Sequence, residues 1–269
     1  MFTGRSLAAD VLAVGAPYPL ALTGGCALRA HGVVGWSRGV GVATEHPARL
    51  EWIASQVAVG LGELGWEARV AEKGPLFARL VVGGWGESEV GGGFGGLASI
   101  GGFGDPVVGG GFGGPALTGD FGAPEAAGGF GGPASVGGSG GPAEVSVSLC
   151  KEVFCRPPVE TPSGLALALP DAMGVTVRDF VRRGYGRDLA RVAAGADLWS
   201  WPELEELGRR HSRDGLELPD LQGRLIRSEW LDDTEFTGCA DVGRLRRWAQ
   251  LWADDIGERL LEGGVPEER

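Results

Sequence analysis

The chain has 269 residues and a mass of 27.8 kDa, enough for one large domain or two small ones with a substantial core. Its net charge of −11 and isoelectric point near 4.8 argue against bulk electrostatic binding of nucleic acid, which needs a concentrated basic surface. The sequence has no run of eighteen apolar residues, and its four cysteines lack the spacing of a zinc site or a disulfide framework. We therefore expect a cytoplasmic protein with reduced thiols, no membrane association, and neither metal nor cofactor.

The first part of the chain alternates between helical and strand patterns. In order, the expected elements are a helix over 6–14, a strand over 19–23, a short helix over 26–32, a strand over 40–43, a helix over 50–61, and strands over 66–74 and 75–84. The helix over 50–61 has the clearest pattern, because its apolar residues recur at steps of three and four.

The stretch from Leu22 to Glu45 places a glycine turn between a strand and a helix. Glycines at this point let a backbone approach a phosphate closely, and the free N–H groups of the following helix attract an anion. We therefore expect Thr23, Gly24 and Gly25 to belong to an anion-binding turn. Tight turns use the same residues without any ligand, so the pattern alone is weak. Cys26, at the start of the helix, is expected to be a small packed residue rather than a reactive thiol.

Residues 83–145 form a tandem repeat of nine residues. The aromatic residues that mark it are Trp85, Phe94, Phe103, Phe112, Phe121 and Phe130, and Ser139 takes the seventh place. The glycine positions resemble the calcium-binding nonapeptide of β-rolls, but the aspartate column holds Ser88, Leu97 and five prolines, so calcium is not expected. The repeat is either an ordered coil that stacks its aromatic residues or a flexible insertion. We favour the flexible form, because little apolar surface offsets the ordering entropy.

Beyond the repeat, a strand over 145–149 precedes a helical half. The expected helices cover 172–183, 187–194, 202–210, 219–228 and 241–261. The last carries one apolar stripe, expected to pack in the core: Leu245, Trp248, Trp252, Ile256 and Leu260. The predicted organisation is an α/β core over 1–82 and 146–169, the repeat insertion over 83–145 as an enlarged hairpin loop, and a helical domain over 170–269.

Three motifs in order carry a family resemblance: LTGGCALRAHG with VATE, CKEVFCRPP, and GVTVRDFVRRGYGRDL. Together they resemble the nucleotidyltransferase-fold proteins of the AbiEii/AbiGii toxin family, in its actinobacterial form. The resemblance covers residues 15–82 and 143–262 and leaves the repeat as an extra. It implies a small mixed sheet with flanking helices. It also implies nucleotidyl transfer by two divalent cations, held by an Asp-x-Asp pair on one strand and a third aspartate on a neighbouring strand.

The chain departs from this pattern at every metal carboxylate. The corresponding positions are Gly39 and Gly41 for the Asp-x-Asp pair, Ser148 for the third aspartate, Thr176 for a lysine and Arg191 for a further aspartate, whereas Arg187 and Asp188 agree with the family. Charge stabilisation is nearly the whole of phosphoryl-transfer chemistry, so losing the metal ligands predicts losing the transfer. The sequence therefore predicts a degenerate nucleotidyltransferase with no catalytic residues.

The remaining polar residues point to an anion site. The candidate ligand-binding residues are Thr23, Gly24, Gly25, Ser37, Arg38, Arg178, Arg187 and Asp188. Arginines four residues apart would form basic ridges if the helices continued across Gly184 and Gly186, and solvated ion pairs are the alternative. Glu45 and Glu144 are candidate substitute carboxylates for a rearranged site with Mg²⁺ and a nucleoside triphosphate, although solvated edge glutamates account for them more simply.

We therefore expect a protein that binds a small anionic ligand or a protein partner in the former nucleotide cleft, without nucleotidyl transfer. Two enzymatic alternatives stay open. One is a metal-free enzyme acting on a small metabolite, with Ser37, Arg38, Ser146 and Ser148 facing the cleft; the other is a toxin with a rearranged metal site. A third alternative places the function in the repeat, as an interaction segment with regularly spaced aromatic residues.

Overall fold

The computed structural model describes residues 6–37, 39–83 and 144–263, and the fold is given for these. Arg38 and the predicted repeat, apart from its end residues, lie outside these ranges. The elements up to the repeat are α1 (Leu7–Val14), β1 (Ala21–Leu22), α2 (Gly24–Ala30), β2 (Gly39–Thr44), α3 (Leu50–Glu63), β3 (Glu67–Lys73) and β4 (Phe77–Gly83). Those after it are β5 (Val145–Lys151), β6 (Val159–Thr161), β7 (Gly164–Ala166), α4 (Leu169–Arg183), α5 (Gly186–Ala193), α6 (Trp201–His211), α7 (Leu218–Arg227) and α8 (Val242–Gly263).

A mixed sheet of seven strands forms the centre of the α/β half, in the order β3-β4-β5-β2-β1-β7-β6. The fold is therefore mixed α/β, as predicted. β2 and β5 pair in parallel, whereas β4 pairs with β5 in antiparallel fashion, with Val82 opposite Val145. The two strands that flank the insertion are thus hairpin partners, so the sheet continues across the insertion point.

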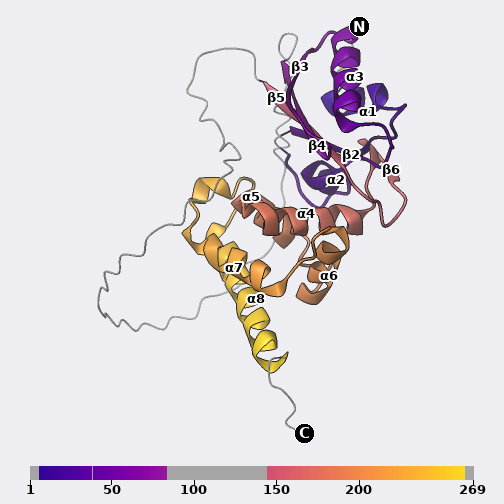
Figure 1. Ribbon diagram of the computed structural model, residues 1–269. Helices are drawn as coiled ribbons and strands as arrows, with labels where there is room; N and C mark the ends of the chain where they lie inside the picture. Colours follow the sequence, from indigo (N-terminus) through magenta and orange to yellow (C-terminus); the bar gives the residue numbers. More distant parts are fainter. Residues whose placement is uncertain (1–5, 38, 84–143, 264–269) are drawn as a thin grey trace, which may run out of the picture. The chain divides into compact units, whose positions relative to one another are not determined.

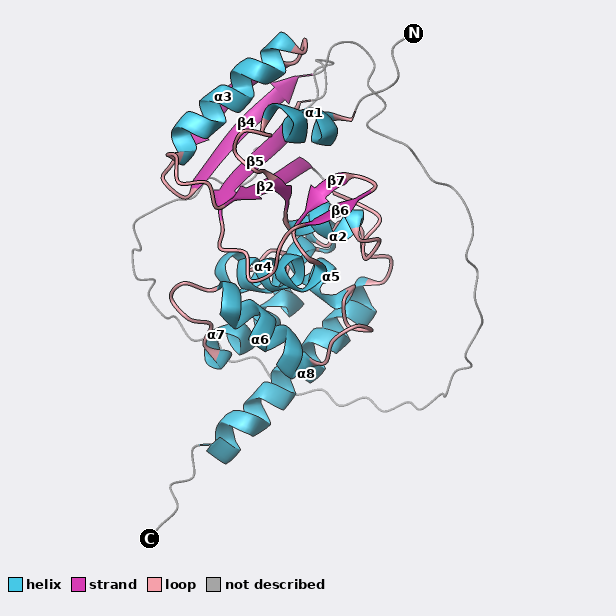
Figure 2. Ribbon diagram, turned by 90° about the vertical axis from the view of Figure 1, so that its right-hand side faces the viewer, coloured by secondary structure: helices cyan, strands magenta, loops and turns pink. Residues whose placement is uncertain are grey.

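The two faces of the sheet are covered differently. On one face α3 and α1 pack over the strands, as Figures 1 and 2 show, and bury Val42, Leu80 and Leu149 together with Ile53 and Val57 of α3. On the other face α2 lies against β2 and β7, and α4 packs in turn on α2. Over β4 and β5 this second face keeps partly or fully exposed side chains, among them Arg79, Val81, Ser146 and Ser148. Polar side chains therefore remain accessible beside α2.

The helical half is built around α4, which packs closely on α6 and also contacts α5 and α7, while α7 packs on α8 (Figure 1). The predicted stripe of α8 is confirmed at Leu245, Trp252 and Ile256, which are buried, whereas Leu260 is 37% exposed. Trp252 Nε1 donates to the buried carboxylate of Glu205 at 2.9 Å, so this core contains a polar contact. In the described part of the chain, no helix combines the length and apolar character needed to cross a bilayer.

Two sequence expectations are corrected here. The hairpin of β6 and β7 was not predicted, because strands of three residues are too short to show an alternating pattern. The basic ridges across the glycines do not form. Gly184 ends α4 in the left-handed conformation, at φ 67°, and α5 begins a separate helix at Gly186.

Candidate anion-binding site

The glycine turn lies directly against the centre of the sheet. Thr23 precedes α2, and its backbone N donates to the carbonyl oxygen of Gly41 at 2.9 Å. Gly24 adopts a φ of 53°, a conformation that L side chains rarely adopt, so the turn requires glycine. Because α2 has only seven residues, its dipole is short, and most of any positive charge at this turn has to come from side chains.

The structure brings together Gly39, Gly41 and Ser148, the three positions where the sequence resemblance expects metal aspartates. In the register of β2 and β5, Gly41 lies opposite Ser148 and Gly39 opposite Ser146, so all four residues face the α2 side of the sheet. A Cβ atom at Gly39 would collide with the carbonyl oxygen of Ser146, and one at Gly41 would lie 3.1 Å from the carbonyl oxygen of Thr23. Both obstacles are backbone atoms, so the strands leave little space for the carboxylates of an Asp-x-Asp pair.

Cys26 and Ser37 make hydrogen bonds to backbone groups of Gly39 and Gly41. Both donate to the carbonyl oxygen of Gly39 at 2.8 Å, and the Cys26 sulfur also accepts from the backbone N of Gly41 at 3.4 Å. The two side chains are 3.1 Å apart. The structure therefore gives Ser37, predicted as a ligand-binding residue, a local role in holding the edge of β2. The neighbouring candidate Arg38 lies outside the described residues.

Arg191 of α5 supplies a positive charge at the turn. Its guanidinium packs on Gly25, where a Cβ atom would lie only 2.7 Å from Cζ, and Cζ lies 4.6 Å from the centroid of the Trp36 ring. Its Nη1 donates to Asp188 Oδ1 at 3.0 Å. Gly25 is thus needed for the approach of this side chain. The sequence places Arg191 at the position of a family aspartate and on a basic ridge with Arg183 and Arg187 that could bind an anion beside Gly24, but Arg191 is not among the predicted ligand-binding residues.

Two buried polar atoms at this turn have no hydrogen-bond partner: Nε of Arg191 and Oγ1 of Thr23. The side chain of Arg191 is 12% exposed and Thr23 is 8% exposed. The Thr23 hydroxyl does not cap α2, although the residue occupies the N-cap position. Leaving a buried donor unsatisfied costs about 1–3 kcal/mol, so two of them beside one turn suggest an acceptor that completes the site.

The charge of Arg191 is balanced by Asp188, which is 1% exposed and also contacts Arg183 at 3.0 Å. Burial raises the pKa of Asp188 above its ordinary value, while Arg183 and Arg191 act in the opposite direction. Burial lowers the pKa of Arg191, although a guanidinium stays protonated at neutral pH. The ion pairs continue as a chain of alternating sign: Glu152, Arg178, Asp179, Arg183, Asp188 and Arg191. This chain connects the end of β5 with the glycine turn.

The other predicted basic residues have different surroundings. Arg178 is held by Glu152 at 2.7 Å and by Asp179 at 2.8 Å, so it joins the sheet to α4 rather than facing the turn. Arg187 lies over the ring of Tyr185, with Cζ 4.4 Å from the centroid. Asp188 reaches the turn only indirectly, because it pairs with Arg191 and Arg191 packs on Gly25. Of the predicted ligand-binding residues, the structure thus gathers Thr23, Gly24 and Gly25 around an arginine that was not among them.

Glu45 and Glu144 lie at opposite ends of the paired strands. Glu45 accepts from the backbone N of Phe154 at 2.8 Å, and Glu144 is exposed and 3.4 Å from Arg69. Glu45 follows Gly41 by four residues, and Glu144 precedes Ser148 by four, so the strand rise separates them by about 26 Å. The structure does not bring these carboxylates together, and no single metal ion can contact both.

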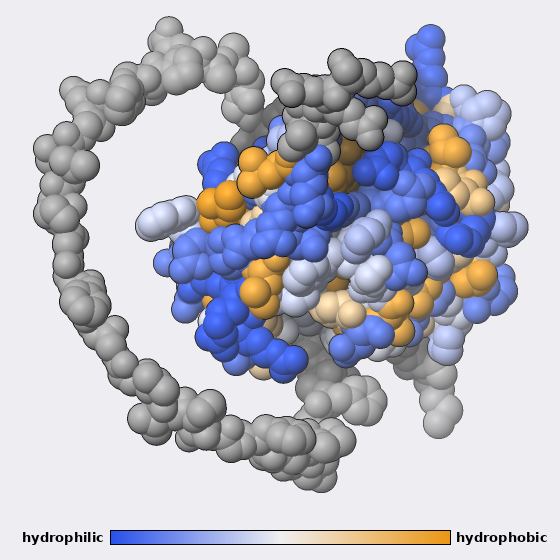
Figure 3. Space-filling view, turned by 90° about the horizontal axis from the view of Figure 1, so that it is seen from below, coloured by the Kyte–Doolittle hydropathy of each residue, from blue (hydrophilic) through white to orange (hydrophobic). Residues whose placement is uncertain are grey.

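A concave region lies on the helical half. It is a cavity of about 450 Å³ lined by residues of α4, of α7 and of the segment between α6 and α7, including Arg178, Arg182, Arg224 and Arg227. Arg224 already donates to the carbonyl oxygen of Val181 at 2.8 Å. Figure 3 shows mostly hydrophilic side chains on the face it displays, with hydrophobic residues in small scattered groups. The lining of the cavity is polar, so it does not suit an apolar ligand.

Comparison with known proteins gives a fold-level likeness only. No family model matches the chain, and no curated protein matches its sequence. Among solved structures, the chain is similar to JHP933 from Helicobacter pylori, with a TM-score of 0.49 and 8% identity over 94% of this chain and 90% of that chain. It is also similar to a candidate nucleotidyltransferase from H. pylori, with a TM-score of 0.42 and 9% identity over 95% and 94% of the two chains.

A third similar structure is MenT4, a nucleotidyltransferase toxin from Mycobacterium tuberculosis, with a TM-score of 0.44 and 13% identity over 96% of this chain and 94% of that chain. Two of the three structures thus carry a nucleotidyltransferase name. All three scores are below 0.5, so they assign no residue role to this chain. Membership of the AbiEii/AbiGii family stays a prediction from the motifs.

Proposed function

We propose that this chain is a degenerate nucleotidyltransferase-fold protein that binds an anionic ligand at the Gly24–Gly25 turn, without metal and without nucleotidyl transfer. One observation carries the proposal: the guanidinium of Arg191 packs on Gly25 with its Nε unpartnered, and the hydroxyl of Thr23, two residues before Gly25, also has no partner. A phosphate or carboxylate oxygen can accept a hydrogen bond from either group. Charge-assisted hydrogen bonds of this kind are stronger than hydrogen bonds between neutral groups.

The electrostatics of the strands agree with this proposal. A metal-dependent site needs carboxylates to hold the cations that neutralise a phosphate, and these strands offer Gly39, Gly41 and Ser148 instead. An arginine supplies positive charge without any carboxylate ligand. The loss of three aspartates and the presence of Arg191 at the same turn are therefore consistent with one change, from metal-mediated to direct anion binding.

The test is calorimetric titration of the full chain with inorganic pyrophosphate and with a nucleoside triphosphate, in EDTA and in excess Mg²⁺. We expect binding in EDTA that Mg²⁺ does not strengthen. Arg191→Gln should weaken binding about tenfold or more, because a hydrogen bond to a charged group contributes about 1.5–3 kcal/mol. Arg209→Gln is the matched control, since Arg209 lies on α6 and pairs with the exposed Glu206.

A second measurement addresses catalysis. Incubation with labelled nucleoside triphosphates, Mg²⁺ or Mn²⁺, and tRNA or protein acceptors should give no transfer of label. Metal-dependent labelling that Glu45→Gln or Glu144→Gln abolishes would overturn the proposal in favour of a rearranged metal site. Equal affinity in the wild type and in Arg191→Gln would show that the anion binds elsewhere.

A further inference from the structure

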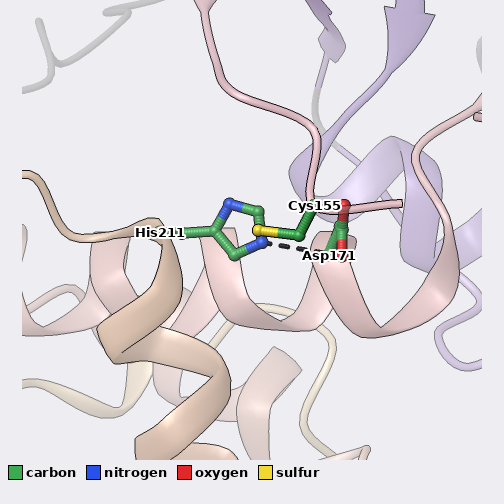
Figure 4. A group of neighbouring side chains, drawn as sticks. All are labelled: Cys155, Asp171 and His211. Carbon is green, nitrogen blue, oxygen red and sulfur yellow. Dashed lines mark ion pairs between the residues drawn. The ribbon is translucent and has the colours of Figure 1, made fainter. Parts of the chain in front are cut away.

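We infer that Cys155, Asp171 and His211 form a binding site for a thiophilic divalent cation of the zinc type. The three residues come from separate elements: the loop between β5 and β6, the first turn of α4, and the last residue of α6. One donor atom from each lies within 4.8 Å of the other two, and Figure 4 shows the side chains pointing toward one another. Sequence spacing had predicted no metal, because the three donors are far apart along the chain.

The donor set selects the class of cation. A thiolate, an imidazole and a carboxylate are all zinc ligands, whereas Mg²⁺ and Ca²⁺ prefer oxygen alone. His211 Nε2 lies 3.7 Å from Asp171 Oδ1, too far for a hydrogen bond. Two ligands of a tetrahedral ion with bonds of about 2.0–2.1 Å are separated by about 3.4 Å, so this pair needs to close only slightly.

The surroundings of the cluster favour a bound cation over free side chains. Asp171 is 1% exposed and His211 is buried, while Cys155 is exposed and leaves a path from solvent. The backbone N of Arg156 donates to Asp171 Oδ2 at 2.9 Å, and Oδ1 lies on the His211 side. Outer contacts of this kind orient a carboxylate ligand toward its metal. The half-exposed guanidinium of Arg156 lies 3.3 Å from Oδ1 and has to turn toward solvent for Oδ1 to bind a cation.

The charges of the three donors suit a divalent cation. A metal ion binds the deprotonated thiolate of a cysteine and the neutral imidazole of a histidine, so binding at Cys155 and His211 releases the proton of the thiol. One divalent cation with one thiolate, one carboxylate and a neutral imidazole is a neutral site.

A cation here would fasten the β5–β6 loop of the α/β half to α4 and α6. The same region is joined by Arg178, which donates to the carbonyl oxygen of His211 at 3.3 Å and contacts Glu152. Three protein ligands leave a fourth tetrahedral position open for water or another small ligand. This site is independent of the proposed anion site, and neither depends on the other.

The experiment is titration of the reduced, full-length, metal-free protein with Co²⁺, followed by displacement with Zn²⁺. We expect one equivalent of tetrahedral Co²⁺ with a sulfur-to-cobalt charge-transfer band, and a rise in the melting temperature when Zn²⁺ replaces it. Cys155→Ser should lose the band and weaken binding at least tenfold, since even outer-shell changes cost about 10–100-fold. Because Cys155 is exposed, this variant should fold normally.

Cys239→Ser is the matched control, because it removes another thiol that lies outside the cluster. It should leave the band and the stoichiometry unchanged. His211→Gln should abolish the tetrahedral spectrum while leaving the Cys155 thiol in place. A spectrum that survives in Cys155→Ser, an octahedral spectrum in the wild type, or no Co²⁺ binding at all would each overturn the inference.

Discussion

The strands beside the glycine turn and the helices packed near it differ in charge. The strand positions carry no charged side chain, whereas the helices carry ion pairs. The strand positions carry Gly39, Gly41 and Ser148, and backbone atoms fill the space that a side chain at Gly39 would need. The helices carry buried ion pairs that end at Arg191 on the turn. The difference shows that the charge near the turn comes from helical side chains fixed by pairing, whereas the strands contribute shape and backbone.

The largest effect should come from breaking the buried ion pairs at Asp188. Asp188→Asn leaves Arg191, whose side chain is 12% exposed, without its carboxylate partner, whereas Arg183 is 42% exposed and keeps Asp179. We expect the free energy of unfolding to fall by about 3–5 kcal/mol, the usual cost of removing one partner from a buried pair. Urea denaturation of the full chain measures it.

Glu206→Gln provides the control for this change. Glu206 also pairs with two arginines, Arg209 and Arg210, but all three side chains are nearly half exposed. Exposed pairs contribute about 0–1 kcal/mol, so this variant should be close to the wild type. Equal losses at Asp188 and Glu206 would contradict the view that buried pairing fixes Arg191.

The crowding around Gly39 in β2 is tested by adding a methyl group there, and the same change at Gly62 in the helix α3 is the control. Gly39→Ala forces a Cβ atom against the carbonyl oxygen of Ser146, so we expect a loss of about 1–3 kcal/mol. Gly62→Ala, on the exposed face of α3, meets no atom within 4 Å and should gain about 0.5–1 kcal/mol from helix propensity. Thermal denaturation of both variants shows whether each change raises or lowers the stability. A stable Gly39→Ala would mean that the strands can still accept a side chain at this position.

Removing a hydrogen bond to Glu205, another buried carboxylate of the helical half, should have a smaller effect than the change at Asp188. Glu205 accepts from Trp252 Nε1 at 2.9 Å and from Arg259 Nη1 at 2.9 Å. Trp252→Phe removes the neutral donor but leaves the arginine, so we expect a loss of about 1–3 kcal/mol in urea denaturation. Trp248→Phe is the control, because its ring packs beside Trp252 and is only partly buried. A larger effect at Trp248 would show that packing, and not the hydrogen bond, dominates.

The smallest effects should come from the two candidate substitute carboxylates. Glu144→Gln removes an exposed contact to Arg69 and should change stability by less than about 1 kcal/mol. Glu45→Gln keeps an acceptor for the backbone N of Phe154 and should change it little as well. Neither variant should alter the affinity for pyrophosphate in calorimetry. A Mg²⁺-dependent loss of affinity in either one would revive the rearranged metal site.

Most secondary structure followed from local pattern. The stripe from Leu50 to Leu61, the break at Gly184 and the alternation in β5 are all visible in short windows, and α3, α4 and β5 follow them closely. The helix expected over 172–183 begins earlier, at Leu169, because Pro170 lies in the first turn of α4, where a missing N–H costs nothing. The β6–β7 hairpin was missed because its strands are defined by pairing, not by pattern.

The sequence by itself determined the order of the elements apart from β6 and β7, and the absence of carboxylates at Gly39, Gly41 and Ser148, since both depend only on which residues occur at which positions. The tertiary structure alone decided that Arg191 rests on Gly25, and that Cys155, Asp171 and His211 share one point in space. Those contacts join segments far apart in the chain. They depend on how α4, α5 and α6 pack around α2 and the end of β5, and such packing leaves no local periodic signal.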